Sequence, residues 1–522
     1  MSSPQLRPAG AIGGVHPAVL DRRIRDLVLI GLTGLIPAVI ALGIVVEIPD
    51  ASFATVVLVL GAIAGVLGVV ALMASTRYEV TVTLLALYLG LLDGPVKLGL
   101  PGGELTHAVR NILILAVCVG AVMRLVVRRE PVRLPALSGW VLAFVAVVAL
   151  EAFNPKTAGI LKVVGGFRQQ LQWVPFFFFA FVLMRSKRRF RQFFLIMGVC
   201  ALANGVLATY QTGLSPAQLA SWGPGYRVLF QPVSVGKKAG HARVYGSEGE
   251  ARVRPVGLGS DSGFSGGVGL LALPFSLALL ATWRSRRRWV AAVLALGAIA
   301  GILTGLGRLQ VVGGVLGVIA FFLLAAVGGR RVKRPLGALL AVVALAVPIG
   351  AVFVSIVGSG TFSRYNTFET NSASSIVTHK SAAYTKIPGM LLRDPFGVGL
   401  GTVGAVGGFG GANAEPLNVS SESQYNFIAD ELGAPGLALW IMLSVYVVVV
   451  IARGLRRVRD GELAILLAGA CAPFVALIFM GFSGPLTTSA VLGPYFWFAI
   501  GIVAYWFAGP GRDARSTIAA EP

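Results

Sequence analysis

Apolar stretches of about 20 residues recur along the chain, and short polar segments separate them. As an α-helix, such a stretch is long enough to cross the hydrocarbon core of a bilayer. The pattern therefore predicts an all-α, polytopic membrane protein with about fourteen spans. We expect them at residues 26–47, 52–74, 79–97, 108–127, 135–153, 161–184, 190–211, 263–283, 288–304, 309–328, 335–358, 426–452, 462–482 and 487–509.

Two of these spans need comment. The third is interrupted by Asp93, Gly94 and Pro95, which makes it the weakest of the series. The first follows a basic tail, is too long for a removable signal peptide and lacks a small-residue cleavage site. We interpret it as a signal anchor.

Basic residues predict the orientation of the spans. They gather in alternate loops, and positive loops stay in the cytoplasm, so both termini are expected inside. The clusters are Arg77; Arg124, Arg128, Arg129 and Arg133; Arg185, Lys187, Arg188, Arg189 and Arg191; Arg284, Arg286, Arg287 and Arg288; Arg330, Arg331, Lys333 and Arg334; Arg453, Arg456, Arg457 and Arg459; and Arg512 and Arg515.

Composition agrees with a membrane protein. Of 522 residues, 56% are hydrophobic and 13% are charged, with a mean hydropathy of +0.81; a soluble protein carries about twice that charged fraction. The net charge of +22 would also suit nucleic-acid binding. Because the positive charge lies in short, regularly spaced loops, we interpret it as the charge that keeps these loops in the cytoplasm. We therefore expect no nucleic-acid partner.

Two connections are much longer than the others and are expected outside the membrane. Long loops in compact proteins are often functional, and these contain aromatic, charged and Gly-Pro positions. In the second loop, Ile376, Lys380, Tyr384, Ile387 and Leu391 recur at helical spacing and predict an amphipathic surface helix. The organisation predicted is a cytoplasmic tail (1–25), a transmembrane bundle (26–211), a loop (212–262), a second bundle (263–358), the large loop (359–425), the last spans (426–509) and a tail (510–522).

Three arginines are expected near the outer side of the membrane: Arg308 at the boundary, Arg168 about two helical turns below it, and Arg254 just before a span. Arginine binds phosphate oxygens in bidentate geometry, so the three are expected to converge on a membrane-embedded anionic headgroup. The alternative is that each one snorkels to the interface for structural reasons. Cys118, Cys200 and Cys471 show neither metal-ligand nor disulfide spacing.

An ordered set of segments from about residue 150 to 450 carries a family resemblance. The segments are FNPKTAGILKVVGGFRQQL, YQTGLSP, RVRPVGLGSDSGFSGGVGLLALP, LTGLGRLQVVGGVLGVI, HKSAAYTKIPGMLLRDPFGVGLGT and SESQYNFIADELGAPGLALW. Together they resemble the O-antigen ligase and polymerase superfamily of bacterial polysaccharide assembly. Gly307 stands where that family usually has serine.

The resemblance implies a metal- and cofactor-independent glycosyltransferase of the bacterial cytoplasmic membrane. Members take a glycan from an undecaprenyl-pyrophosphate donor and transfer it to an acceptor, here a glycan or a lipid, at the outer membrane face. By resemblance, Arg168 and Arg308 bind the donor's pyrophosphate, and Arg254 assists. Fixed positive charge would stabilise the leaving group.

The expected general base departs from the family pattern. Ligases carry a histidine in the last hallmark, where this chain has Gln424 followed by Tyr425, and glutamine cannot act as a base. Glu422 is the first substitute and His379 the second; Lys380, Gln424 and Tyr425 are candidate contacts to donor or acceptor. Without a catalytic role, Glu422 would be a solvated loop carboxylate or a negative charge at a helix N-terminus. His379 would then be an ordinary residue of the surface helix.

The missing histidine favours a polymerase over a ligase. A polysaccharide exporter or lipid-linked glycan flippase is the alternative from another class. Such a protein would show ionisable residues midway through several spans, whereas the charges here lie mostly at span ends. A peptidoglycan glycosyltransferase of the shape-and-elongation type is a third reading, but it has fewer spans and its loop arrangement fits less well.

Overall fold

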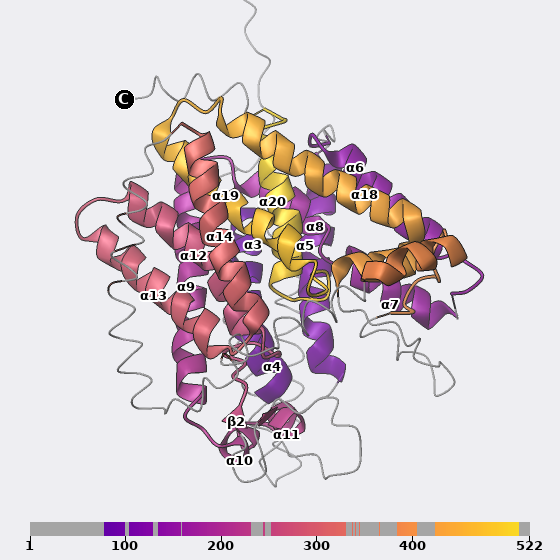
Figure 1. Cartoon of the computed structure of the whole chain (residues 1–522), viewed down its shortest axis with the longest axis horizontal. Helices are drawn as coiled ribbons and strands as arrows, with labels where there is room; N and C mark the ends of the chain where they lie inside the picture. Colours follow the sequence, from indigo (N-terminus) through magenta and orange to yellow (C-terminus); the bar gives the residue numbers. More distant parts are fainter. Residues whose placement is uncertain are drawn as a thin grey trace, which may run out of the picture. The chain divides into compact units, whose positions relative to one another are not determined.

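A computed structural model describes residues 78–99, 104–128, 134–157, 159–230, 244–245, 252–329, 384–403 and 423–510, together with residues 337, 340, 344 and 365. The described chain is mostly helical (Figure 1). By compactness it divides into two units, Met1–Leu85 with Asn111–Val132, and Ala86–Arg110 with Arg133–Pro522. In the first unit only parts of two helices are described. The residues of the candidate site described below belong to the second unit.

Seven helices in the described part are long and apolar enough to cross a membrane, which fits a multi-pass membrane protein. They are Glu79–Gly99, Lys187–Thr212, Phe264–Thr282, Arg287–Thr304, Arg308–Val327, Gln424–Leu455 and Gly461–Met480. Each coincides with a predicted span. Three shorter apolar helices, Val109–Val122, Ser138–Glu151 and Leu492–Trp506, fall on three more. The predicted spans at 26–47 and 52–74, and nearly all of 335–358, lie outside the described residues.

Helix α12 (Phe264–Thr282) forms the centre of the second unit. Every residue from Phe264 to Ala281 is buried. Around it pack α9 (Lys187–Gln211), α13 (Arg287–Thr304), α14 (Arg308–Val327), α19 (Gly461–Met480) and α20 (Leu492–Trp506) (Figure 1). A helix that is apolar on all sides is stable only when other helices or lipid surround it, and here protein does.

Small residues let these helices approach closely. A Cβ atom at Gly205 of α9 would lie 2.2 Å from the carbonyl oxygen of Gly297 in α13, and one at Gly269 of α12 would lie 2.5 Å from that of Ala298. Such contacts are typical of membrane helices, whose association depends on close packing. The rings of Phe194 in α9 and Phe275 in α12 also stack, with their centroids 4.5 Å apart.

The single span predicted over 161–184 is wrong in one respect, because the structure breaks it into α7 (Ile160–Leu171) and α8 (Pro175–Leu183). Pro175 explains the break. A proline has no N–H to donate, and its ring clashes with the carbonyl four residues earlier, which here belongs to Leu171. The turn between the two helices carries Trp173, which is completely buried.

The interruption expected at Asp93–Pro95 does not end the third span. Helix α3 (Tyr78–Leu87) continues through a π-helical turn (Tyr88–Leu92) into α4 (Asp93–Gly99). A π-turn widens the helix locally, and its position just before Pro95 fits the hydrogen bond that proline cannot donate. The polar residues of α4 consequently stay in a helix.

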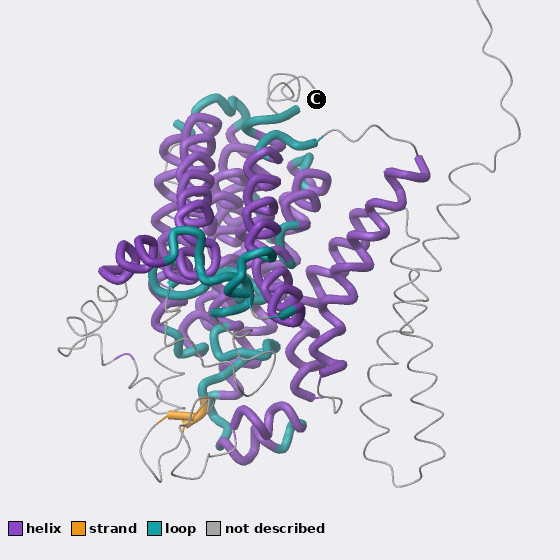
Figure 2. Tube along the Cα trace, turned by 90° about the vertical axis from the view of Figure 1, so that its right-hand side faces the viewer, coloured by secondary structure: helices purple, strands orange, loops and turns teal. Residues whose placement is uncertain are grey.

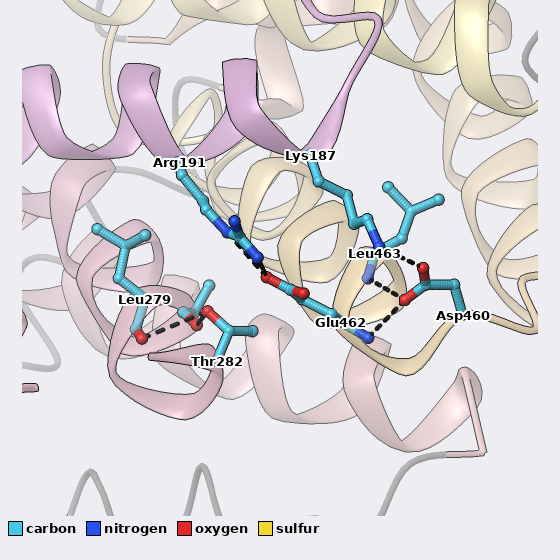
Figure 3. A network of polar contacts seen from close by, with 8 residues as sticks. Lys187, Arg191, Leu279, Thr282, Asp460, Glu462 and Leu463 are labelled. Carbon is cyan, nitrogen blue, oxygen red and sulfur yellow. Dashed lines mark hydrogen bonds and ion pairs between the residues drawn. The ribbon is translucent and has the colours of Figure 1, made fainter. Parts of the chain in front are cut away.

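At one end of the bundle, which we call the basic end, ion pairs join α9 to the start of α19. Lys187 Nζ lies 2.7 Å from Asp460, and Arg191 pairs with Glu462 (Figure 3). Asp460 also caps α19 by accepting hydrogen bonds from the N–H groups of Glu462 and Leu463. Burial opposes ionisation of Asp460, but the Lys187 hydrogen bond and these N–H groups outweigh it and lower the pKa of the carboxyl.

The opposite end, which we call the distal end, carries part of the first long loop. Short helices α10 (Pro216–Ala220) and α11 (Pro224–Phe230) lie there with strands β1 (Val244–Tyr245) and β2 (Arg252–Val253), which pair antiparallel (Figure 2). A small apolar core holds this layer on α4; it consists of Leu98, Leu219, Tyr226, Phe230, Val253 and Val256. The predicted loop is therefore a packed layer in its described parts.

The remaining elements bring the second long loop back to the bundle. A helix over residues 384–393 coincides with the later part of the predicted amphipathic helix; Ile376 and Lys380 lie outside the described residues. Helix α18 (Gln424–Leu455) follows, with a kink at Gly433 (φ 60°, ψ −157°), and packs on α6 (Ser138–Glu151). Residues 481–491 then connect α19 to α20.

Candidate functional site

A cluster of charged side chains lies at the distal end, within α4 and the first turns of α5 (Glu104–Arg128). Asp93 is completely buried, and its Oδ2 atom lies 3.2 Å from Lys97 Nζ and 3.5 Å from Arg110 Nη1. Lys97 and Arg110 are only 7% and 8% exposed. Buried charges need partners, and one carboxylate serves two cations here.

Arg168 of α7 adds a third cation to this group. Its side chain is exposed. The positive charges of Arg110 and Lys97 are close enough to repel that of Arg168. Within the described residues, Arg168 makes no ion pair. We call Asp93, Lys97, Arg110 and Arg168 the cationic cluster. It holds three positive charges and one negative charge.

Several polar atoms of this region have no hydrogen-bond partner among the described residues. They are Tyr88 Oη, Asp93 Oδ1 and Arg110 Nε, all in side chains at least nine-tenths buried. A buried polar group without a partner costs about 1–3 kcal/mol. An anion that accepts from Arg110 and Tyr88 would recover part of that free energy, so the cluster is suited to a negatively charged, oxygen-rich ligand.

Trp173 connects the cationic cluster to the last loop hallmark of the sequence. The guanidinium of Arg110 lies over its ring, 5.4 Å from the ring centroid, and its indole N–H donates to the carbonyl oxygen of Thr487 at 2.8 Å. Gln424, at the start of α18, accepts hydrogen bonds from the N–H groups of Leu486 (2.6 Å) and Thr487 (3.0 Å). A continuous set of contacts therefore runs from Gln424 to Arg110.

Gln424 and Tyr425, proposed from the sequence as donor or acceptor contacts, are both buried. The Gln424 amide is engaged with residues 486 and 487, and the Tyr425 hydroxyl donates to the carbonyl oxygen of Ile478 at 3.0 Å. The Tyr425 ring packs on Phe482, as does Tyr384, whose hydroxyl donates to the carbonyl oxygen of Phe482. Both residues thus fix residues 481–491.

The segment with Arg254 lies along α4. Val253, just before Arg254, and Leu98, just after Lys97, are buried in the same apolar core. Further along, a Cβ atom at Gly94 would lie 2.3 Å from the backbone of Gly259. At the end of α9, the Gln211 side chain accepts from the N–H groups of Val256 and Gly257. Arg254 is half-buried in this setting.

Arg308 is the first residue of α14 and is also half-buried. The beginning of α14 touches that of α12, because Gln310 lies against Gly263 and Gly266. The segments that carry Arg168, Arg254 and Arg308 are thus all at the distal end. Binding of one anion by all three remains a prediction.

A second polar group surrounds Glu431 in α18, which is completely buried. Its oxygens accept from the side-chain amides of Gln169 (3.2 Å) and Gln170 (2.7 Å), and from the N–H of Val403 (3.4 Å). Residues 394–403 reach this position through Gly397, Gly399 and Gly401, all with positive φ. That backbone favours glycine because no Cβ opposes it.

Residues 394–403 are also tied to the turn between α6 and α7. Asp394 pairs with Lys156 and, at 2.8 Å, with Arg393 Nε. Hydrogen bonds from Lys156 and then Arg393 lower the pKa of the Asp394 carboxyl. The Asn154 amide donates to the carbonyl oxygen of Gly397 at 3.2 Å.

Three predicted site residues, Glu422, His379 and Lys380, lie outside the described residues. In the described part, no group of three His, Cys, Asp or Glu side chains could hold a metal ion. The sequence reasoning missed Lys97, Arg110, Trp173 and Glu431. For Lys97, Arg110 and Glu431 the available signal was a charged residue within or beside an apolar stretch, which is costly in a membrane and commonly functional; the sequence held no such signal for Trp173.

Comparison with models of known protein families, and with curated proteins, finds no match for this chain.

Proposed function

We propose that the protein is a glycosyltransferase of the bacterial cytoplasmic membrane that uses an undecaprenyl-pyrophosphate-linked glycan as donor. The observation that carries the proposal is the cationic cluster, because three cations against one carboxylate leave two positive charges in excess. Two of the three cations, Lys97 and Arg110, are buried, so part of this excess lies away from water, which is costly at the end of a membrane bundle. A pyrophosphate anchored by its own lipid would neutralise it.

In the proposed reaction, the bond between the donor's anomeric carbon and a phosphate oxygen breaks, and the acceptor's hydroxyl oxygen bonds to that carbon. The electron pair of the broken bond leaves with undecaprenyl pyrophosphate. Arg110, Lys97 and Arg168 favour this step by stabilising the negative charge on the leaving group. Arg254 and Arg308 would extend the same positive field. The hydroxyl proton goes to a base.

Both base candidates are close in sequence to residues that contact the segment 481–491. Glu422 precedes Gln424 by two residues, which limits the separation of their Cα atoms to about 7 Å. Gln424 is bonded to Thr487, and Thr487 to Trp173 beneath Arg110. His379 lies five residues before Tyr384, which is bonded to Phe482. Glu422 is the stronger candidate because its tether is shorter.

The orientation follows from the same arrangement. The basic end carries Lys187 and Arg191 and would face the cytoplasm by the positive-inside rule, so the cationic cluster would face outward. Lipid-linked glycans would then be joined on the outer membrane face. We favour a polymerase, with growing glycan as acceptor, over a ligase.

A lipid-linked glycan flippase or polysaccharide exporter is the second candidate. Asp93 and Lys97 lie in an apolar helix long enough to span a membrane and are buried there. Buried ionisable residues in spanning helices also mark transport pathways.

One experiment separates the two. The purified protein in lipid vesicles is given a lipid-linked oligosaccharide, and lipid-linked dimers and released undecaprenyl pyrophosphate are measured by mass spectrometry. A transferase forms both products, and Arg168→Ala reduces them strongly, whereas Arg284→Ala at the basic end does not. Movement of intact donor across the bilayer without product would establish the flippase instead.

A further inference from the structure

We propose that Glu431 is a positioning residue for Arg168, acting through the amides of Gln169 and Gln170; the inference rests on the proposed function of Arg168. All hydrogen-bond donors to the Glu431 carboxylate in the described part of the chain are neutral N–H groups: the side-chain amides of Gln169 and Gln170 and the backbone N–H of Val403. The carboxylate thus accepts three hydrogen bonds and joins α18, α7 and residues 394–403.

The geometry of α7 explains why this matters for Arg168. Successive residues of an α-helix are about 100° apart around its axis, so Gln169 and Gln170 point inward while Arg168 points away from them. Both glutamines are buried (4% and 0% exposed), whereas Arg168 is exposed. The two hydrogen bonds from the Gln169 and Gln170 side-chain amides to Glu431 therefore fix the rotation of α7 about its axis.

That rotation sets the position of the Arg168 guanidinium. Side-chain tips lie about 5–6 Å from a helix axis, so a rotation of about 20° displaces them by about 2 Å. A misplacement of about 1 Å at a reacting group can cost about a hundred-fold in rate. Close packing supports the same contact surface, because a Cβ atom at Gly166 would lie 2.6 Å from Leu400 Cβ and 2.7 Å from the N atom of Gly401.

The network also predicts which substitution is tolerated. Gln170 Oε1 is buried without a hydrogen-bond partner among the described residues. In Glu431→Gln, the new carbonyl can still accept from Gln169 and Val403. Its new amide can donate to Gln170 Oε1 once the Gln170 amide turns over. Glu431→Leu has similar size but accepts nothing.

The test is a double-mutant cycle on transfer by the full-length protein in vesicles. Glu431→Leu should lower kcat/KM at least about tenfold, with Glu431→Gln near wild type. In the Arg168→Ala background, Glu431→Leu should change the rate by less than about twofold, because a residue that acts through Arg168 has nothing left to position. Asn154→Ala, which removes another hydrogen bond of residues 394–403, should be additive with Arg168→Ala. Additive loss for Glu431→Leu, or an inactive Glu431→Gln, would overturn the proposal.

A second readout does not depend on activity. In Arg168→Cys, the rate of reaction with a charged thiol reagent reports the position of the side chain. Glu431→Leu should change that rate at least about threefold, and Glu431→Gln should leave it unchanged. A shift in labelling without any glycosyl transfer would reject the proposed function and retain the positioning role. Equal labelling in all backgrounds would reject the positioning role alone.

Discussion

The indole N–H of Trp173 donates a 2.8 Å hydrogen bond to the carbonyl oxygen of Thr487, 314 positions away in the sequence. The bond joins the break between α7 and α8 to residues 481–491, which Gln424 holds from the other side. Since Arg110 lies over the same indole ring, this one side chain joins the cationic cluster to the segment that follows Glu422.

Replacing Trp173 should separate its two contacts. Trp173→Phe keeps an aromatic face for Arg110 but leaves the Thr487 carbonyl without its donor, at a cost of about 1–3 kcal/mol in stability. Trp173→Leu also removes the cation–π contact, which is worth about 0.5–2 kcal/mol. We expect the Leu variant to bind the lipid-linked donor more weakly than the Phe variant, as measured by donor titration. Equal affinities would mean that the ring does not orient Arg110.

The arginines should differ in what they tolerate. Arg308→Lys keeps the charge but loses the planar, bidentate fork, so a severe loss of transfer is expected, and Arg168→Ala should be similarly impaired. Both variants should insert into membranes and be extracted intact, because neither side chain is deeply buried. Arg284→Lys, at an exposed position of the basic end, is the matched control. Normal polymerisation by Arg308→Ala would mean that Arg308 only anchors the helix end at the membrane boundary and does not bind pyrophosphate.

The general base can be identified by a substitution that removes its basicity and keeps its size. Glu422→Gln preserves size and removes basicity, so transfer should slow by at least about a hundred-fold while donor binding stays near normal. His379→Ala should have the smaller effect. Single-turnover rates on a preformed donor complex measure the step directly. The reverse order of effects would assign the base to His379, and no effect from either would leave catalysis to leaving-group stabilisation.

Labelling of single cysteines in intact cells, with the outer permeability barrier opened, tests the orientation. Cysteines introduced at positions 235 and 410 should react with a membrane-impermeant thiol reagent, and those at 187 and 332 should not. Position 187 carries the lysine that pairs with Asp460 at the basic end, so its protection would place that end in the cytoplasm. The opposite labelling pattern would exclude an extracytoplasmic site.

The Asp394 ion pairs predict a defined pH dependence. The pKa of Asp394 is lower in the folded protein than in the unfolded chain, so its contribution to stability is complete above the unfolded value, about 3.9. It is lost as the pH falls through the folded value. Between pH 8 and 5, thermal unfolding of wild type and Asp394→Asn should differ by a constant amount. The difference should shrink below about pH 4, and a difference that shrinks already near pH 6 would contradict this assignment.

Much of the helical framework was predictable because membrane spans are long and uniformly apolar. Seven predicted spans coincide with helices of spanning length. The errors occur at prolines, because a proline either ends a helix or is accommodated within one. Pro175 ends a helix inside a predicted span, while Pro95 lies in a helix that continues past it. A π-helical turn before Pro95 changes the local hydrogen-bond pattern, so that the helix continues although Pro95 has no N–H to donate. Hydrophobicity alone does not reveal such a turn.

The candidate site was less predictable because it is assembled from distant segments. Asp93 and Arg110 are joined across 17 positions, and Gln169 and Glu431 across 262. Arg168 could be singled out from the sequence because it is a charge near the end of an apolar stretch. Glu431, in the run DELGAPG, was overlooked although it lies near the start of the predicted span 426–452, because its partners Gln169 and Gln170 are brought to it only by the fold.

The burial of α12 on every side has a consequence for biosynthesis. Its neighbours come from both sides of it in the sequence, and α19 ends about 200 residues after α12. At about 5–20 residues per second, the ribosome needs about 10–40 s to make that stretch. During that time, a helix bearing Gly266, Gly269 and Ser276 on its surface must sit in lipid, or beside an insertion chaperone, without its final neighbours. Completion of the bundle therefore depends on the synthesis of α19, well after α12 has entered the membrane.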